Sequence, residues 1–440
     1  MLDFDKLKNT IRDTKILRFK GSVSEIVGLT IYAHGPKASI GELVYIKSEK
    51  GLIPAEVQGF KENKTLLMPF GDMSGISPGD LIISSGDFLK VKVGPKIVGR
   101  VLNGLGEPLD EKGELIWEKE YPLYQEPPHP LKRKRITEEL SLGIKAIDGL
   151  LTCGSGQRLG IFSGSGVGKS TLLGMIARNS SADINVIALI GERRREVREF
   201  LENDLGPQGI DKSIVVVASS DQPAILRIKA AFLATAIAEY FRDQDAQVVL
   251  MMDSVTRFAM AQREIGLAIG EPPATKGYTP SVFALLPRLL ERAGTAEKGS
   301  ITGLYTVLVD GDDMNEPIAD ATRGILDGHI VLSRQLASLG HFPAIDVLNS
   351  ISRVMINITD AEHLQAASKI KELMAIYTEA KDLIDVGAYQ KGNNPKIDLA
   401  IKFIDKINQF LKQSINDYCP YENTENFLGE LYHEITEMDR

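Results

Sequence analysis

The sequence predicts an α/β protein in three parts: a small β-barrel, a central parallel sheet covered by helices, and a C-terminal helical domain. Three observations support this prediction. Short β-rich runs fill residues 18–93, strand and helix patterns alternate over 94–358, and strand patterns stop near residue 360. Such alternation is typical of a parallel sheet with helices on its faces. We therefore divide the chain into residues 1–17, 18–93, 94–358 and 359–440.

The first segment contains a short amphipathic pattern. Residues 3–13 place Phe4, Leu7 and Ile11 on one face of an expected helix. An isolated helix of this length is marginal in water, so its apolar stripe needs a partner. Two interpretations stay open: docking onto another protein, or packing on the chain's own domain.

The second segment consists of β-rich runs separated by turn signals such as Gly35-Pro36 and Pro78-Gly79-Asp80. Many short strands with turns at close intervals are typical of a small barrel. The expected strands are residues 23–27, 43–46, 55–60, 66–68 and 81–84.

The central and C-terminal segments differ in their periodicity. Apolar runs predict central strands at 186–190, 214–218, 248–252 and 305–309, and helical patterns occupy 193–203, 223–242 and 256–266. Beyond these, only helical spacing remains, over residues 361–385 and 395–415.

Composition excludes several classes of protein. No apolar run of about eighteen residues occurs, so we expect no membrane span, and the first residues do not resemble a secretory signal. Cys153 and Cys419 lie far apart, which fits a reducing cytoplasm and argues against a disulfide or a metal site. The net charge of −8 gives no general attraction to nucleic acid. The one basic cluster, residues 132–135, is interpreted as a solvated linker.

The most informative motif is the glycine-rich loop at residues 163–171, which follows the apolar run 159–162 and precedes a helical pattern. Such a loop cradles phosphates with its backbone N–H groups, Lys169 reaches the β- and γ-phosphates, and the Ser170 hydroxyl ligates Mg²⁺. Ser163 stands where the usual motif has its first glycine. The alternative is a glycine-rich turn with an exposed lysine. The expected nucleotide-binding residues here are Gly164, Ser165, Gly166, Val167, Gly168, Lys169, Ser170 and Thr171.

Two further strands end in acidic residues. Asp253 ends the run 248–252, and ligands of parallel sheets bind at the carboxyl ends of strands, so we expect it beside Ser170 in the Mg²⁺ shell. The alternative for Asp253 is a helix N-cap. Glu192 and Arg193 follow the run 186–190. Glu192 is expected to polarise the attacking water and Arg193 to contact phosphate, although a Glu in such a place is often only a surface residue.

Together, these motifs resemble the rotary ATPase superfamily and, within it, the flagellar branch of the type III protein-export ATPases. The resemblance covers residues 18–440. The segments that carry it, besides the phosphate loop, are Gly191-Glu192-Arg193, Asp253-Ser254-Val255-Thr256-Arg257-Phe258-Ala259, Ser350-Ile351-Ser352-Arg353-Val354, and residues 99–110, 149–154, 236–243 and 270–278; residues 27–31 and 38–43 point to the flagellar branch.

The resemblance implies a RecA-like central domain that hydrolyses ATP with Mg²⁺. It implies that Arg257 lies near the phosphates, that Phe342 stacks on adenine and that Tyr389 closes that pocket. It also implies that Arg353 acts in trans on the γ-phosphate of a neighbouring subunit, where such an arginine contributes roughly 10³–10⁵ in rate. Because this chain carries both Glu192 and Arg353, a homo-oligomeric ring can complete every site, and the family implies six subunits.

The resemblance further implies partners and a location. A dimeric stator or regulator docks at residues 2–13, and a coiled-coil stalk enters a pore lined by residues 271–281. An ordinary surface loop is the alternative for 271–281. The ring releases chaperones and delivers export substrates to a membrane export gate. It is therefore cytoplasmic, with peripheral association at the cytoplasmic face of the membrane.

Four alternatives are weighed against this function. A catalytic subunit of a rotary ATP synthase and an injectisome secretion ATPase share the fold and the chemistry. An RNA translocase ring needs stacking aromatics and a basic pore, which the composition does not support. A non-catalytic scaffold needs the loss of Lys169 or Glu192, and both are present. Two residues depart from the family pattern: Arg194, where a small residue is usual, and Thr279, where a proline is common.

Overall fold

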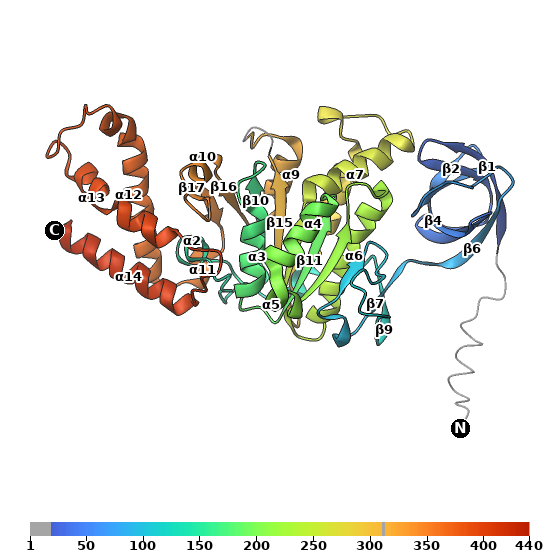
Figure 1. The fold of residues 1–440 in the computed structure, drawn as a ribbon, viewed down its shortest axis with the longest axis horizontal. Helices are drawn as coiled ribbons and strands as arrows, with labels where there is room; N and C mark the ends of the chain where they lie inside the picture. Colours follow the sequence, from blue (N-terminus) through green and yellow to red (C-terminus); the bar gives the residue numbers. More distant parts are fainter. Residues whose placement is uncertain (1–18, 310–312, 440) are drawn as a thin grey trace, which may run out of the picture.

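The structure is a computed structural model that describes residues 19–309 and 313–439. A β-barrel and a helical domain lie at opposite ends of its long axis, with a sheet covered by helices between them (Figure 1). The expected three-part α/β fold is therefore confirmed. The helix expected at residues 3–13 falls outside the described residues. Within the described ranges, no helix combines the length and the apolar character needed to span a membrane.

The barrel is closed, with strand order β1-β2-β5-β4-β3-β6. Side chains alternate along its strands, so that Val44 and Ile46 point into the core. The prediction lacked β2, because only Gly28 and Leu29 separate it from β1 in a tight hairpin. The strands are β1 (Lys20–Val27), β2 (Thr30–His34), β3 (Glu42–Ser48), β4 (Gly51–Lys61), β5 (Lys64–Pro69) and β6 (Leu81–Phe88).

The central sheet has strand order β17-β16-β10-β15-β13-β11-β12-β8. Its strands run parallel except β17, which is antiparallel to β16, and β14, which pairs antiparallel with β15. All four predicted central strands are confirmed. The strands are β8 (Val101–Asn103), β10 (Arg158–Ser163), β11 (Ile184–Ile190), β12 (Ser213–Ala218), β13 (Gln247–Asp253), β14 (Gly294–Thr295), β15 (Ser300–Leu308), β16 (Gly328–Leu332) and β17 (Ile345–Ser352), and a separate ribbon pairs β7 (Lys90–Val93) with β9 (Lys119–Pro122).

Helices cover this sheet. The longest, α6 (Ala224–Arg242), is buried along nearly its whole length because it packs on β11, β12 and β13 and also contacts the β7–β9 ribbon. The other helices of this region are α2 (Lys145–Leu150), α3 (Lys169–Asn179), α4 (Arg194–Glu199), α5 (Gly206–Asp211), α7 (Val255–Ala268), α8 (Pro280–Leu290), α9 (Pro317–Ile325), α10 (Arg334–Ser338) and α11 (Met355–Ile358).

The helix predicted over 193–203 is less regular than expected. The regular α4 gives way at Phe200 to a π-helical segment, Phe200–Leu205, and α5 follows directly. Gly206 takes a positive φ of 60° and precedes Pro207, which has no N–H to donate. A single straight helix therefore cannot continue through this point.

The helical domain consists of α12 (Ala361–Asp385), α13 (Pro395–Leu411) and α14 (Tyr421–Met438). The helix predicted over 395–415 ends four residues early, at Leu411. The cause is tertiary: the Gln413 N–H donates to the Phe342 carbonyl at 3.0 Å, and the Gln413 side chain bonds the Lys145 N–H and the Gly143 carbonyl, each at 2.9 Å. Gln413 thus ties the helical domain to the central domain.

The interpretation of the basic cluster 132–135 as a solvated linker is wrong for Arg133. Lys132 is exposed and forms an ion pair with Glu297 at 3.1 Å. Arg133 instead turns inward, where its Nη1 donates to the Ala293 carbonyl at 2.9 Å and its Nη2 donates to the Glu291 carbonyl. The guanidinium of Arg133 therefore binds the segment that follows α8.

Candidate active site at the phosphate loop

The phosphate loop connects β10 to α3 at the edge where the parallel strands end, which we call the carboxyl edge of the sheet. Gly166 and Gly168 have left-handed φ values of 76° and 88°, which a residue with a side chain rarely adopts. Val167 is buried and anchors the loop, whereas Ser165 and Gly166 are exposed. Because Gly168 is the N-cap of α3, the positive end of a helix dipole faces this edge. The loop can therefore accept an anion such as a phosphate.

Lys169 joins the loop to two acids. Its Nζ lies 2.5 Å from Asp253 Oδ1 and 3.7 Å from Glu192 Oε1. The Thr306 hydroxyl donates to the same Asp253 oxygen at 2.7 Å. Burial alone would lower the pKa of Lys169, but the charges of Asp253 and Glu192 outweigh it, and the pKa is raised. The ammonium is therefore a permanent cation between two carboxyl groups.

Glu192 is the second carboxyl group beside Lys169. Burial, followed by the nearby charge of Asp253, raises its pKa to about 7, although Lys169 acts in the opposite direction. Its Oε1 is buried and has no hydrogen-bond donor among the described residues. A carboxyl group with a pKa near neutrality can accept a proton from water at physiological pH.

Arg257 lies beside Glu192 on the first turns of α7. Gly191 permits this approach, because a Cβ there would come within 2.9 Å of the Arg257 Cβ. The buried Nε of Arg257 has no acceptor among the described residues. The N-cap of α7 is Ser254, whose hydroxyl accepts from the Arg257 N–H at 3.2 Å. The carboxylate of Asp253 therefore does not serve as that cap.

Phe342 lies next to the phosphate loop, where a Cβ on Gly168 would be 3.7 Å from its ring. The ring is half exposed, so one face remains available for stacking. Tyr389 lies elsewhere, in the connection between α12 and α13. Its hydroxyl is within hydrogen-bond distance of the Asn394 carbonyl and Asp398 Oδ1, at 2.9 and 3.0 Å. Within residues 19–309 and 313–439, no hydrogen bond or ring contact joins Tyr389 to Phe342.

The arginines after β11 point away from this group. Arg193 is exposed and pairs with Glu196 at 3.0 Å. Arg194, one of the two departures from the family pattern, is exposed and pairs with Asp221 at 2.5 Å. The structure therefore does not bring Arg193 to Lys169, and the charge of Arg194 is directed to Asp221 rather than to Glu192.

Arg353 is the one expected site residue at the opposite edge of the sheet. It follows β17, whose antiparallel pairing sets Ser352 against Gly328, the first residue of β16. The phosphate loop follows the last residue of β10, which runs parallel to β16. The side chain of Arg353 is exposed. A chain thus presents its phosphate loop on one edge and Arg353 on the other.

Sequence reasoning missed some of the polar groups at the site. Thr306, which bonds Asp253, lies within a predicted strand, but the sequence does not reveal that β15 neighbours β13. Glu196 shares a hydrogen bond with Glu192, and this bond raises the pKa of Glu192. The spacing from 192 to 196, one helical turn, is the only signal that could have indicated this contact.

The donor set fits a nucleotide with Mg²⁺. Three buried polar atoms beside the loop, Ser163 Oγ, Glu192 Oε1 and Arg257 Nε, have no hydrogen-bond partner in the described residues, which is uncommon unless a ligand or water satisfies them. Ser170 and Asp253 supply oxygens of the kind that Mg²⁺ prefers, together with phosphates. The cluster can therefore bind a polyphosphate, neutralise its charge and hold a base beside it.

Three family models match the chain. Residues 143–352 match the nucleotide-binding domain of the ATP synthase alpha/beta family, and residues 23–86 match its beta-barrel domain. Residues 359–430 match the T3SS EscN ATPase C-terminal domain.

Relatives match over nearly the full length. A flagellum-specific ATP synthase of Bacillus subtilis is 59% identical over 90% of this chain and 91% of its own. A type 3 secretion system ATPase of Xanthomonas euvesicatoria is 49% identical over 96% of each chain. The structure of the assembled ATPase EscN from the enteropathogenic E. coli type III secretion system superposes with a TM-score of 0.89 at 51% identity, covering 94% of this chain and all of that one. The chain therefore belongs to the ATP synthase alpha/beta family, among its flagellar and type III secretion ATPases, and it is an ATP-hydrolysing enzyme.

Proposed function

We propose that this chain hydrolyses Mg²⁺-ATP as a homohexameric ring and energises flagellar type III protein export. In this role it releases chaperones and delivers export substrates to a membrane export gate, from a position at the cytoplasmic face of the membrane. The flagellar assignment is supported by the 59% identity to the flagellum-specific ATP synthase of Bacillus subtilis, which exceeds the 49% identity to the type 3 secretion system ATPase of Xanthomonas euvesicatoria and the 51% identity to EscN.

The observation that carries the proposal is that one chain holds Glu192 and Arg353 at opposite edges of one sheet. Contacts between unlike surfaces close into a ring when the rotation between subunits allows it. In such a ring the Arg353 edge of each subunit faces the phosphate loop of the next. Every interface then contains a complete site, and an isolated subunit contains none.

The mechanism assigns a task to each group. The N–H groups of the loop and Lys169 bind the phosphates, and Arg257 supports them through its Nε, which has no acceptor among the described residues. When a nucleotide binds, its phosphates replace Asp253 as the partner of the Lys169 ammonium. Ser170 and Asp253 would hold Mg²⁺, which neutralises charge on the phosphates. Glu192, with a pKa near neutrality, orients water and accepts its proton.

Three other groups complete the proposed machinery. Arg353 of the neighbouring subunit stabilises the charge that develops on the γ-phosphate. Phe342 stacks on adenine, and Tyr389 reaches that pocket only if the α12–α13 connection moves. Arg193 can support the phosphates only after its ion pair with Glu196 breaks. That pair is exposed, so breaking it costs little free energy.

The remaining proposals concern organisation and partners. The domain limits are residues 18–93, 94–358 and 359–440, with 1–17 as a docking segment. The stator binds at residues 2–13, so their deletion should abolish its co-purification and preserve ATP binding. The stalk contacts residues 271–281, in line with a solved complex of assembled EscN with its central stalk EscO.

The proposal is tested by placing Glu192→Gln in the chromosome of the host and counting filaments by electron microscopy. Glu297→Gln is the matched control, because it removes an exposed carboxylate that pairs with Lys132. We expect bald cells for Glu192→Gln and normal filaments for Glu297→Gln. Normal filaments in both, with loss of effector secretion or of ATP synthesis in Glu192→Gln, would assign the chain to an injectisome or a synthase instead.

A further inference from the structure

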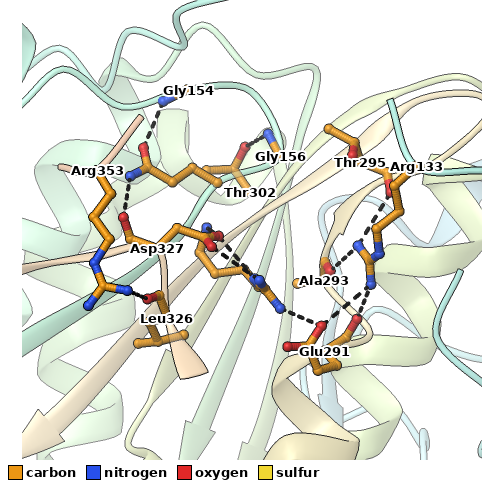
Figure 2. A network of polar contacts seen from close by, with 12 residues as sticks. Arg133, Gly154, Gly156, Glu291, Ala293, Thr295, Thr302, Leu326, Asp327 and Arg353 are labelled. Carbon is orange, nitrogen blue, oxygen red and sulfur yellow. Dashed lines mark hydrogen bonds and ion pairs between the residues drawn. The ribbon is translucent and has the colours of Figure 1, made fainter. Parts of the chain in front are cut away.

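A network of ion pairs and hydrogen bonds lies directly behind Arg353 (Figure 2). Its centre is Asp327, which lies between α9 and β16. The Asp327 carboxylate accepts from Arg158 Nε at 3.0 Å, from Nη2 at 3.1 Å and from the Arg158 backbone N–H at 3.1 Å. The Asp327 N–H donates in turn to the Arg158 carbonyl at 2.9 Å. Two-pronged bonds between arginine and a carboxylate fix orientation as well as distance.

Arg353 donates hydrogen bonds to two carbonyl groups of the turn at Leu326 and Asp327, which connects α9 to β16. Its backbone N–H donates to the Asp327 carbonyl at 3.1 Å, and its Nη1 donates to the Leu326 carbonyl at 3.3 Å. Within residues 19–309 and 313–439, Leu326 provides the only acceptor for the Arg353 guanidinium. The remaining donors of that guanidinium are therefore available to a ligand.

The residue before Arg353 is held as firmly. The Ser352 hydroxyl donates to the Thr152 carbonyl at 2.8 Å and accepts from Gln157 Nε2 at 3.0 Å. Gln157 is fully buried, and its Nε2 also lies 3.3 Å from the Asp327 carbonyl. The backbone on which Arg353 stands is thus fixed through both Ser352 and Asp327.

The far side of Arg158 is fixed as well. Arg158 Nη1 forms an ion pair with Glu291 Oε2 at 2.6 Å. Glu291 follows α8, and Arg133 binds the same segment through the Glu291 and Ala293 carbonyls. Figure 2 shows Arg133, Glu291, Asp327 and Arg353 in one continuous chain of contacts. Arg158 therefore cannot move away from Asp327 without also disturbing its ion pair with Glu291.

We propose that Asp327, clamped by Arg158, is a positioning residue for Arg353: it holds the turn on which Arg353 stands, so that the guanidinium points out of the subunit toward the site of its neighbour. This inference rests on the trans role of Arg353 in the proposed function. An exposed arginine otherwise spreads over many rotamers, and restricting them costs conformational entropy. A displacement of about 1 Å at a catalytic group can lower a rate by roughly 10²-fold.

The test is a double-mutant cycle on the full-length protein in its assembled form, with Asp327→Asn, Arg353→Ala and the double variant. We expect Asp327→Asn to lower kcat by about 10- to 100-fold, with unchanged KM and unchanged binding of a fluorescent ATP analogue. In the Arg353→Ala background, Asp327→Asn should lower kcat no further, because residues that act through one group are non-additive. A merely structural role would lower kcat equally in both backgrounds.

Two further variants keep the outcome interpretable. Arg158→Lys retains the positive charge and removes the fork, so it should reproduce the fall in kcat even if Asp327→Asn assembles poorly. Asp439→Asn breaks an exposed pair with Lys369 at 2.7 Å and should leave kcat unchanged. Equal losses from Asp327→Asn with and without Arg353 overturn the positioning role alone. Full activity of Arg353→Ala overturns both the trans role and the positioning role.

Discussion

Glu192 and Arg353 lie at opposite edges of the same sheet. Glu192 follows the carboxyl end of β11, and Arg353 follows β17, which runs against its neighbour β16. Ser352 pairs with Gly328, the first residue of β16, so Arg353 lies at the edge of the sheet where the parallel strands begin. One subunit therefore cannot bring the two side chains to one phosphate group, although it carries both.

Mixing two inactive variants should restore activity. Glu192→Gln lacks the carboxylate and Arg353→Ala lacks the arginine, and each alone should lose roughly 10³-fold or more in kcat. When mixed rings form, about a quarter of the interfaces combine the intact Glu192 of one subunit with the intact Arg353 of the next. The measurement is phosphate release after co-refolding or co-expression. Activity no higher than that of the separate variants would contradict a shared site.

Specific activity should rise with protein concentration. If each site needs two subunits, dilution below the dissociation constant of the ring removes complete sites. ATPase activity per subunit, measured from nanomolar to micromolar protein, should therefore increase toward a plateau. The plateau should coincide with ring formation observed by light scattering. A flat profile down to nanomolar concentration would show that a single chain is sufficient.

The raised pKa of Glu192 makes stability depend on pH. The folded chain, with a pKa of about 7, binds the Glu192 proton more tightly than the unfolded chain, with its ordinary value of 4.5. The associated stability is present in full below pH 4.5 and is lost as the pH rises to about 7. Glu192→Gln should therefore stabilise the nucleotide-free protein by up to about 3 kcal/mol at pH 8 and by little near pH 4.5. Calorimetric unfolding at both pH values measures the difference in stability between Glu192→Gln and the unmodified chain. A difference that is the same at both pH values would contradict the raised pKa of Glu192.

Removing the ammonium of Lys169 should cost both binding and stability. Lys169→Met leaves Asp253 and Glu192 facing each other without the ammonium between them, and breaking a buried pair costs about 3–5 kcal/mol. ATP turnover should disappear, and the opening free energy of β13 amides in hydrogen exchange should fall. Adding Glu192→Gln should recover part of this loss. Lys132→Met breaks an exposed ion pair with Glu297 and should change the opening free energy of the β13 amides by less than about 1 kcal/mol.

Phe342 should affect substrate binding rather than chemistry. Stacking of an aromatic ring on a base contributes about 1–3 kcal/mol, so Phe342→Ala should raise the KM for ATP by roughly 10-fold or more and leave kcat unchanged. Phe342→Tyr should keep the wild-type KM. Phe427→Ala, which removes an exposed ring from α14, is the control. An equal fall of kcat in Phe342→Ala would mean that the ring positions the phosphates instead.

Much of the fold was predictable because its signals are local. The apolar runs at 186–190, 214–218, 248–252 and 305–309 all became strands. The glycine spacing at 164–168 predicted a loop between strand and helix, and it lies between β10 and α3. The strand β2 was missed because only two residues separate it from β1, too few to show a clear turn signal in the sequence. The α13 boundary was missed because a contact from Gln413 to Phe342, distant in sequence, ends the helix.

The sequence by itself determined the chemical parts of this protein: a phosphate loop, acids at strand ends, and Arg353, the arginine that we propose acts on a neighbouring subunit. Only the tertiary structure decided which parts meet. Strand order places Thr306 beside Asp253 and sets Arg353 against the turn at Leu326 and Asp327. The physical reason is that periodicity and turn propensity act over a few residues. Strand order depends on hydrogen bonding and burial between segments that are far apart along the chain.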